Sequence, residues 1–231
     1  MRILTVVSNY NEEKAILDTL RDLEENSTIK SDILVIDNCS RDNSQAIIRS
    51  QGVDYLFHPV NTGGSAGVIK TALAYAHYHD YDVYCHMDGD NQHSASELDK
   101  LLKPILEDDK DIVIGSRFIE KEGFQSHFLR RIGINLFSSI LTYITKNKLT
   151  DITSGFRAYN KKAIAFFAQN YKHEMEASVQ MLLIASFAKL KITEVPVIMK
   201  PRTSGVSELN LINAIKFPVY GAISLIGTLL Q

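Results

Sequence analysis

Two aspartates, Asp88 and Asp90, stand on either side of a single glycine directly after an apolar run of the chain. A strand projects alternate side chains to one face, so both carboxylates can reach one hard cation where the backbone leaving the strand stays extended. That cation could then hold a diphosphate. An isolated acidic pair of this kind is also common in a solvated turn, so the rest of the chain has to distinguish a metal site from a turn.

Three other polar clusters follow short apolar runs, and each allows a functional and a structural interpretation. Residues 8–13 could meet a base or ribose, or could begin a helix with Asn11 as its N-cap. Residues 37–44 could offer a carboxylate to a pyrimidine imide or a ribose hydroxyl, or could form a plain turn. The glycines of residues 61–67 would let a ligand approach backbone N–H groups at a helix start, although the cluster matches neither the P-loop nor G-x-G-x-x-G.

Short apolar runs alternate with helical patterns along the chain. Strand-like runs lie at residues 3–7, 33–36, 55–57, 83–87 and 112–114. Between them, apolar residues recur at helical spacing, as at Ile16, Leu20 and Leu23. This alternation predicts an α/β fold with a mostly parallel sheet flanked by helices, in which ligands bind at the carboxyl ends of the strands.

Composition limits the class of protein. A length of 231 residues with 45% hydrophobic content fits one catalytic α/β domain. The net charge of -2 argues against general nucleic-acid binding and favours small anionic partners. Two cysteines, Cys39 and Cys85, offer neither a disulfide framework nor metal-ligand spacing, which suits the cytoplasm. The first apolar stretch is too short for a signal sequence, and none reaches the roughly 18 to 20 residues of a bilayer span, so we expect no membrane crossing.

The order of the clusters resembles that of the family 2 glycosyltransferases with the GT-A fold. The resemblance is carried by Tyr-Asn-Glu-Glu at residues 10–13, Asp-x-x-Ser-x-Asp at 37–42, Asn-x-Gly at 61–63 and Asp-x-Asp-x-Gln-His at 88–93. Further motifs resemble the polyprenyl-phosphate branch, typified by dolichyl-phosphate mannose synthase; they lie at residues 115–118, 130–131, 151–159, 194–196 and 202–207.

The resemblance implies an inverting glycosyltransferase. Such an enzyme would move a sugar from a nucleotide diphosphate donor to a polyprenyl phosphate, here undecaprenyl phosphate, and so supply cell-envelope glycan modification. A UDP-sugar is the preferred donor because Asp37 can accept from the uracil imide N–H, although guanine also offers ring donors. Two alternatives stay open: a soluble glycosyltransferase that acts on a sugar hydroxyl, and a non-catalytic subunit that binds a sugar nucleotide.

The resemblance also implies roles for individual residues. Mg²⁺ or Mn²⁺ would be held by Asp88, Asp90 and Gln92. The predicted catalytic residues are Asp88, Asp90, Arg117, Arg131 and Asp151. The acceptor phosphate would be bound by guanidinium groups, which match its oxygens, on Arg117, Arg130, Arg131 and Arg157. The predicted nucleotide-sugar site comprises Asn9, Tyr10, Asn11, Glu12, Asp37, Asn38, Asn61, Gly64, Lys70, Asp88, Gly89 and Arg202.

Some positions allow two roles or depart from the family pattern. Asp151 could orient a sugar hydroxyl or a phosphate-binding arginine, or could cap the turn that follows it. His93 could orient the metal carboxylates or be an ordinary turn histidine. Asn38 and Cys39 stand where an acidic residue and a glycine are common, and Glu208 stands where the family often has lysine. These departures leave the identity of the donor sugar open.

The C-terminal part of the chain is predicted to determine location. After a glycosyltransferase domain at residues 1–208, residues 209–231 form an apolar segment, predicted as apolar or amphipathic helices, with no charge after Lys216. It could lie in the membrane interface, dock on another subunit or a small membrane-protein anchor, or form a core helix. Residues 124–144, with Arg130 and Arg131, would add a basic and apolar surface near anionic lipid. We therefore expect a peripheral protein at the inner face of the cell membrane, with a homo-oligomer left open.

Overall fold

The computed structural model describes residues 1–123, 128–171, 177–201 and 227. Within these residues, seven strands form one sheet in the order β3-β2-β1-β4-β6-β5-β7. The strands are β1 (Ile3–Asn9), β2 (Asp32–Asp37), β3 (Asp54–Phe57), β4 (Val83–Asp88), β5 (Ile112–Ser116), β6 (Arg157–Asn160) and β7 (Ile192–Pro196). Neighbouring strands are parallel except at β6, which is antiparallel to both β4 and β5. The prediction of a mostly parallel sheet is confirmed.

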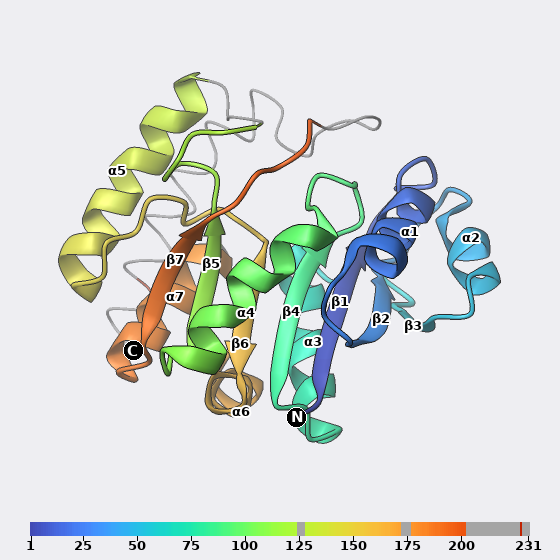
Figure 1. Ribbon diagram of the computed structural model, residues 1–231, viewed down its shortest axis with the longest axis horizontal. Helices are drawn as coiled ribbons and strands as arrows, with labels where there is room; N and C mark the ends of the chain where they lie inside the picture. The colour runs from blue at the N-terminus through green and yellow to red at the C-terminus, as the bar shows by residue number, and fades with distance from the viewer. Residues whose placement is uncertain (124–127, 172–176, 202–226, 228–231) are drawn as a thin grey trace.

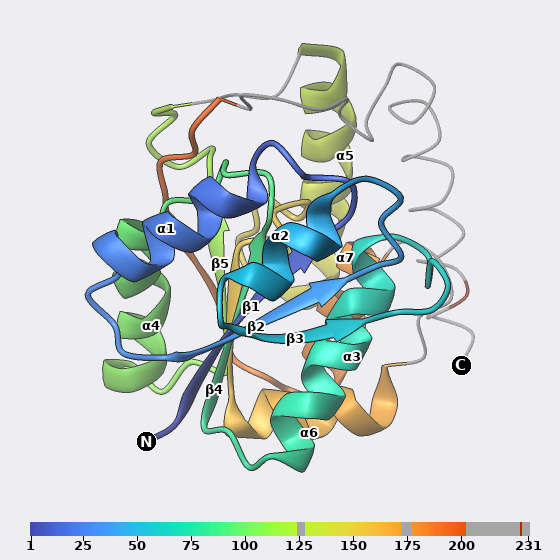
Figure 2. The ribbon, with the colours of Figure 1, turned by 90° about the vertical axis from the view of Figure 1, so that its right-hand side faces the viewer.

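Helices cover both faces of the sheet (Figures 1 and 2). One face carries α1 (Ile16–Asn26), α2 (Ser44–Ser50) and α4 (Leu98–Glu107), the last preceded by the short 3₁₀ helix η1 (Ala95–Glu97). The other face carries α3 (Ser65–Tyr78), α5 (Phe128–Thr145), α6 (Lys161–Asn170) and α7 (Ala177–Phe187). The sheet therefore has one hydrophobic core on each face.

Strand β4 shows how the sequence divides between these two cores. Val83, Cys85 and Met87 are buried against the face that carries α1 and α4. Tyr84, which points the other way, is buried with residues of α3 and α6. Because both faces are covered, an internal strand reads as a continuous apolar run rather than as an alternation of apolar and polar residues.

The structure differs from the sequence-based expectation at three places. β6 and β7 were not among the predicted strands, and β6 supplies the antiparallel member of the sheet. Helix α1 begins at Ile16 with Ala15 as its N-cap, so Asn11 does not cap it. Asn11 instead adopts a left-handed conformation, with φ of 54°.

The predicted membrane segment lies mostly outside the described residues. Of residues 209–231 only Gly227 is described, so the expected C-terminal helices and the domain boundary near residue 208 stay predictions. Arg202 also lies outside the described residues. In the part of the chain that the structure covers, no helix combines the length and apolar character needed to cross a bilayer.

Candidate functional site

The polar clusters meet at the carboxyl edge of the parallel strands, at the top of Figure 1 and opposite the N-terminus. Asn9 at the end of β1 pairs in register with Asp37 at the end of β2, and Ser8 pairs with Asp88 at the end of β4. Arg157 reaches the same edge from the start of the antiparallel β6. Segments far apart in sequence thus contribute to one site.

Asp88 is the partly exposed carboxylate of this edge, with 37% of its side chain accessible. Its Oδ1 accepts a hydrogen bond from Ser8 Oγ at 2.9 Å and lies 3.7 Å from His86 Nε2. Its Oδ2 lies 3.8 Å from His93 Nε2. Burial alone would raise the pKa of Asp88, but the nearby imidazoles of His86 and His93 and the hydrogen bond from Ser8 outweigh it and hold the pKa well below its usual range.

Asp90 lies in the tight turn that follows β4 and is 8% exposed. Its Oδ1 accepts from the backbone N–H of Gln92 at 3.1 Å. The Gln92 side-chain nitrogen donates to the carbonyl of Lys200 at 3.2 Å, so only the amide oxygen of Gln92 could reach a cation. Between the two aspartates a Cβ on Gly89 would lie 2.9 Å from the Ser8 carbonyl, which explains why a glycine separates them.

The donor set fits a divalent cation that is bound together with a diphosphate. Among the residues the structure describes, no three His, Cys, Asp or Glu side chains form a metal-binding group. Mg²⁺ commonly binds through one or two carboxylates plus substrate phosphate oxygens, which is what Asp88 and Asp90 can offer. A Cβ on Gly155 would lie 3.0 Å from Asp88 Oδ2, so glycine keeps the space beside this oxygen open.

Asp37, the predicted base-binding carboxylate, is fully buried. It accepts hydrogen bonds from Asn9 Nδ2 at 2.7 Å, from the backbone N–H and hydroxyl of Ser40, and from Gln45 Nε2 at 3.0 Å. A contact between Asp37 and a base would have to displace one of these donors. The neighbouring Cys39 has φ of 69°, a conformation that favours glycine. The turn is therefore kept although cysteine stands where the family commonly has glycine.

Asn38 ties the end of β2 to the glycine-rich cluster. Its Oδ1 accepts from the backbone N–H of Thr62 at 3.0 Å, and its Nδ2 donates to the Gly64 carbonyl at 3.1 Å. Asn61 Oδ1 accepts from the N–H groups of Gly63 and Gly64 at 3.0 and 3.2 Å. These N–H groups, expected to face a ligand, are therefore bonded within the loop, while Lys70 on α3 is exposed.

The loops after β1 and β2 form one hydrogen-bonded unit. Asn11 Oδ1 accepts from the N–H of Arg41 at 2.8 Å, and the N–H of Glu12 donates to Ser44 Oγ at 3.0 Å. Tyr10 is half-buried beside them. Sequence reasoning treated the clusters at residues 8–13 and 37–44 as separate sites, because contacts between residues about 30 positions apart leave no local pattern in the sequence.

Arg117 and Asp151 form a buried ion pair at the end of β5. Arg117 Nε donates to Asp151 Oδ2 at 2.6 Å and Nη2 donates to Oδ1 at 2.8 Å. Burial would raise the pKa of Asp151, but the hydrogen bonds from Arg117 lower it overall. Glu194 of β7, which sequence reasoning did not assign to the site, accepts from the N–H groups of Thr150 and Asp151 at 2.8 and 2.9 Å. Burial raises the pKa of Glu194 despite these hydrogen bonds.

The remaining predicted arginines differ in accessibility. Arg131 of α5 is half-buried, with its guanidinium carbon 3.4 Å from the ring centroid of Phe118. Arg157 is 3% exposed and donates to the carbonyls of Ser154 and Ile152, both at 2.8 Å. A phosphate contact would require Arg157 to leave these carbonyls. The side chain of Arg130 lies outside the described residues.

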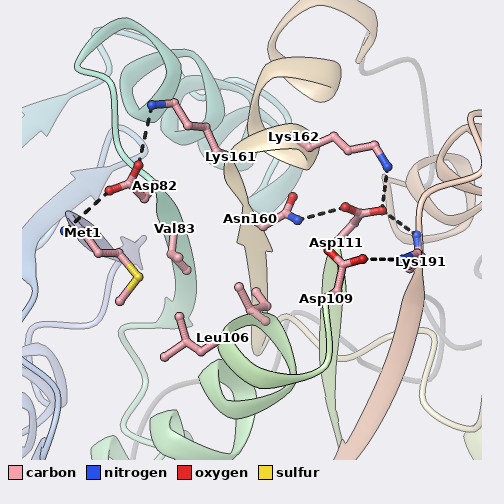
Figure 3. Close-up of a pocket in the computed structure, with 11 residues that line it drawn as sticks. Met1, Asp82, Val83, Leu106, Asp109, Asp111, Asn160, Lys161, Lys162 and Lys191 are labelled. Carbon is pink, nitrogen blue, oxygen red and sulfur yellow. Dashed lines mark hydrogen bonds and ion pairs between the residues drawn. The ribbon is translucent and has the colours of Figure 1, made fainter.

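A separate hollow of about 460 Å³ lies at the opposite edge of the sheet. Figure 3 shows its charged side chains engaged with one another: Lys162 Nζ lies 3.0 Å from Asp111, and Lys191 pairs with Asp109. Its lining includes Asp82 and Val83, at the start of the strand that Asp88 ends. This hollow is therefore remote from the predicted site, and none of the predicted site residues lines it.

The chain is similar to characterised proteins over most of its length. Residues 5–166 match the model of the Glycosyl transferase family 2. A UDP-N-acetylglucosamine–dolichyl-phosphate N-acetylglucosaminyltransferase of Methanococcus voltae is 28% identical over 84% of each chain. An undecaprenyl-phosphate mannosyltransferase of Micrococcus luteus is 26% identical over 91% of this chain and 88% of its own.

Solved structures share the fold. A glucosyl-3-phosphoglycerate synthase of Mycobacterium tuberculosis, crystallised with Mn²⁺, UDP and glucosyl-3-phosphoglycerate, superposes with a TM-score of 0.70. It is 19% identical, and the match covers 98% of this chain and 80% of that one. At this identity the likeness concerns the fold alone.

Proposed function

The chain belongs to glycosyl transferase family 2 and is a glycosyltransferase with the GT-A fold, and on this premise we propose that it transfers a sugar from a nucleotide diphosphate to a polyprenyl phosphate. The observation that carries the proposal is the turn formed by residues 151–155. At one end Asp151 holds Arg117, and at the other Gly155 abuts Asp88. The turn thus brings Asp88, the carboxylate that would bind the cation, beside Arg117, whose guanidinium group is suited to phosphate.

The acceptor in this reaction supplies its own nucleophile. A phosphate monoester carries about 1.5 to 2 negative charges at neutral pH, so its oxygen needs little deprotonation. That oxygen attacks the anomeric carbon as the bond from this carbon to the donor diphosphate breaks, which inverts the configuration and releases a nucleoside diphosphate. No general base is required, and the chain contributes positioning and electrostatic stabilisation.

The site residues divide between the two substrates. Asp88 and Asp90, with the Gln92 amide oxygen, would hold Mg²⁺ or Mn²⁺, which neutralises charge on the departing diphosphate when bound. Arg131 would bind the acceptor phosphate because its guanidinium is half-buried and lies over Phe118 at this edge. Arg117, whose guanidinium group is held in place by Asp151, would add a second, fixed positive charge beside the acceptor phosphate.

We prefer a UDP-sugar as the donor and undecaprenyl phosphate as the acceptor. Two observations support this choice: one relative is named for a UDP-sugar, and another for undecaprenyl phosphate. Both are similar to this chain over 84% or more of its length.

A donor and acceptor panel tests the proposal directly. The purified chain is incubated with labelled UDP- and GDP-sugars and either undecaprenyl phosphate or a free sugar as acceptor, with Mn²⁺ or with EDTA. We expect label in the organic phase with at least one donor, only when a divalent cation is present. No lipid-linked product from any donor would contradict the proposal. Transfer to a sugar hydroxyl would indicate the soluble enzyme, and donor binding without transfer would indicate a non-catalytic subunit.

An Arg131→Ala variant should impair acceptor use selectively. A hydrogen bond to a charged group contributes about 1.5–3 kcal/mol, so KM for the polyprenyl phosphate should rise roughly tenfold or more. The dissociation constant of the nucleotide-sugar should stay within about twofold, and isothermal titration checks this.

Arg49→Ala is the matched control for this prediction. Arg49 also lies over an aromatic ring, with its guanidinium carbon 4.9 Å from the Phe57 centroid, but it belongs to α2 on the opposite face. Equal losses of donor and acceptor binding in Arg131→Ala, or equal effects of the two substitutions, would argue against the assignment.

The proposal includes peripheral binding to an anionic membrane surface. Helix α5, which carries Arg131, exposes Leu136 and Tyr143 by 58% and 77%. They are seven residues apart and so lie on one face of the helix. Burial of apolar side chains in the membrane interface would hold the acceptor-binding arginine near the lipid phosphate.

A Leu136→Gln/Tyr143→Gln variant should bind vesicles more weakly. Fully burying one such side chain contributes about 1.5–3 kcal/mol, so loss of the two should lower the partition coefficient onto phosphatidylglycerol vesicles at least about tenfold. Tyr78→Gln is the control, because Tyr78 is 84% exposed at the end of α3. Vesicle sedimentation measures both, and unchanged binding of the α5 variant would exclude this face.

A further inference from the structure

His86 is a buried imidazole within β4, two residues before Asp88, and it is 1% exposed. Its Nδ1 lies 2.6 Å from the hydroxyl of Tyr84. Its Nε2 has no hydrogen-bond partner among the described residues and lies 3.7 Å from Asp88 Oδ1. A buried polar atom is rarely left without a hydrogen-bond partner, so a buried Nε2 this close to Asp88 points to a role toward that carboxylate.

The charges around His86 determine which nitrogen carries the proton. A lone pair on Nε2 would face the carboxylate of Asp88 and be repelled, whereas an N–H group is attracted to it. Nε2 therefore carries the proton, and Nδ1 accepts from the Tyr84 hydroxyl. Burial raises the pKa of Tyr84 well above its usual value, so this hydroxyl stays protonated and can donate.

His93 presents the same arrangement to the second oxygen of Asp88. The backbone N–H of Asp88 donates to His93 Nδ1 at 3.0 Å, which leaves the proton on Nε2, 3.8 Å from Asp88 Oδ2. The ring of His93 stacks on Phe156 with 4.7 Å between centroids. Each oxygen of the Asp88 carboxylate thus faces one imidazole N–H. At 3.7 and 3.8 Å, both N···O distances are too long for a hydrogen bond.

We propose that His86 is a positioning residue for Asp88, and that its Nε2–H, directed by the Tyr84 hydroxyl, holds the carboxylate in the orientation that binds the donor with its cation. Tyr84, His86 and Asp88 alternate along one strand and therefore share one face. Ser8 Oγ on β1 fixes the same oxygen from the side, at 2.9 Å. The inference rests on the proposed function, because it assigns Asp88 to the donor complex.

The test measures the Mn²⁺ affinity of four variants by electron paramagnetic resonance. One series contains UDP, and a parallel series contains GDP. Loss of a group that orients a metal ligand typically costs 10- to 100-fold in affinity, so His86→Leu should bind Mn²⁺ at least about tenfold more weakly. His86→Gln keeps an N–H of similar reach and should restore affinity to within about threefold. Tyr84→Phe, which loses one neutral hydrogen bond, should weaken binding about threefold.

Tyr159→Phe is the matched control. Tyr159 stacks on Tyr84 with 5.2 Å between centroids, and its hydroxyl is buried too, but among the described residues this hydroxyl forms no hydrogen bond with His86. Its Mn²⁺ affinity should stay within about twofold of the unsubstituted protein. In the transfer assay, His86→Leu should raise the donor KM and leave the polyprenyl phosphate KM unchanged.

The outcomes separate this inference from the proposed function. Native Mn²⁺ affinity in His86→Leu, no rescue in His86→Gln, or equal losses in Tyr84→Phe and Tyr159→Phe would overturn the role of His86. If His86→Leu does not fold, the His86→Gln and Tyr84→Phe affinities decide. If the unsubstituted protein binds Mn²⁺ with UDP but makes no lipid-linked sugar, the proposed function fails while the affinities still test His86.

Discussion

An Asp90→Asn variant is expected to lose about a hundredfold or more in kcat/KM while it folds normally. Asparagine has nearly the shape of aspartate and keeps an oxygen that can accept from the Gln92 N–H, 3.1 Å away in the native turn. The substitution removes the charge that a divalent cation and its diphosphate require. The measurement is kcat/KM over a range of Mn²⁺ concentrations, together with Tm.

Asp109→Asn serves as the control for this loss. It removes a carboxylate from the hollow at the opposite edge of the sheet, where Asp109 pairs with exposed Lys191. Exposed ion pairs contribute little, so both Tm and kcat/KM should stay close to native. Native turnover by Asp90→Asn would remove Asp90 from the donor site.

Asp151→Asn is expected to lower the free energy of unfolding by about 3–5 kcal/mol. The side chains of Arg117 and Asp151 are 9% and 0% exposed and form two hydrogen bonds, so removal of one charge leaves the other buried and uncompensated. Urea denaturation followed by circular dichroism gives the difference. A loss below about 1 kcal/mol would mean that water reaches the pair.

A double variant, Arg117→Met with Asp151→Leu, separates the structural role of the pair from its role in binding. Apolar residues of similar volume can replace a buried ion pair at little cost, so the double variant should be more stable than Asp151→Asn. It should nevertheless lose activity toward polyprenyl phosphate. Native activity in a stable double variant would show that the pair only supports the fold.

The stability supplied by this pair should depend on pH in a defined direction. Burial raises the pKa of folded Asp151, but hydrogen bonds from Arg117 outweigh this and lower the pKa below its unfolded value of about 3.9. Its contribution is therefore complete above about pH 4 and is lost as the pH falls through the folded value. The difference in unfolding free energy between native protein and Asp151→Asn should shrink in acid.

All five predicted strands are present; β1, β2, β4 and β5 are apolar runs covered on both faces, whereas β3 is a partly exposed edge strand. β6 and β7 lack that signal for different reasons. β6 is only four residues long and begins with Arg157, whose buried guanidinium donates to two carbonyls. β7 contains the charged Glu194 and ends at Pro196, a residue type that disfavours strands, so it does not read as an apolar run. Their place in the sheet depends on partners far away in sequence.

The sequence predicted that ligands would bind at the carboxyl ends of the strands, where the structure brings the polar clusters together, but it did not reveal the contacts of individual polar residues. Asp37 and Asn38 were expected to face a nucleotide, and the structure shows them bonded to residues of neighbouring loops. Such contacts join segments some 25 to 30 positions apart, as with Asn9 and Asp37, so no local pattern reveals them. Glu194 belongs to the motif at residues 194–196 but was given no role for the same reason, since it accepts hydrogen bonds from the distant backbone N–H groups of Thr150 and Asp151.

The position of β6 has a consequence for folding during synthesis. β6 fills the gap between β4 and β5, but it begins at Arg157, after both of its neighbours have been made. Until Arg157 to Asn160 emerge from the ribosome, β4 and β5 each present an apolar edge with unpaired backbone groups. A nascent or truncated chain that stops short of Arg157 should therefore be the form that chaperones capture and that aggregates.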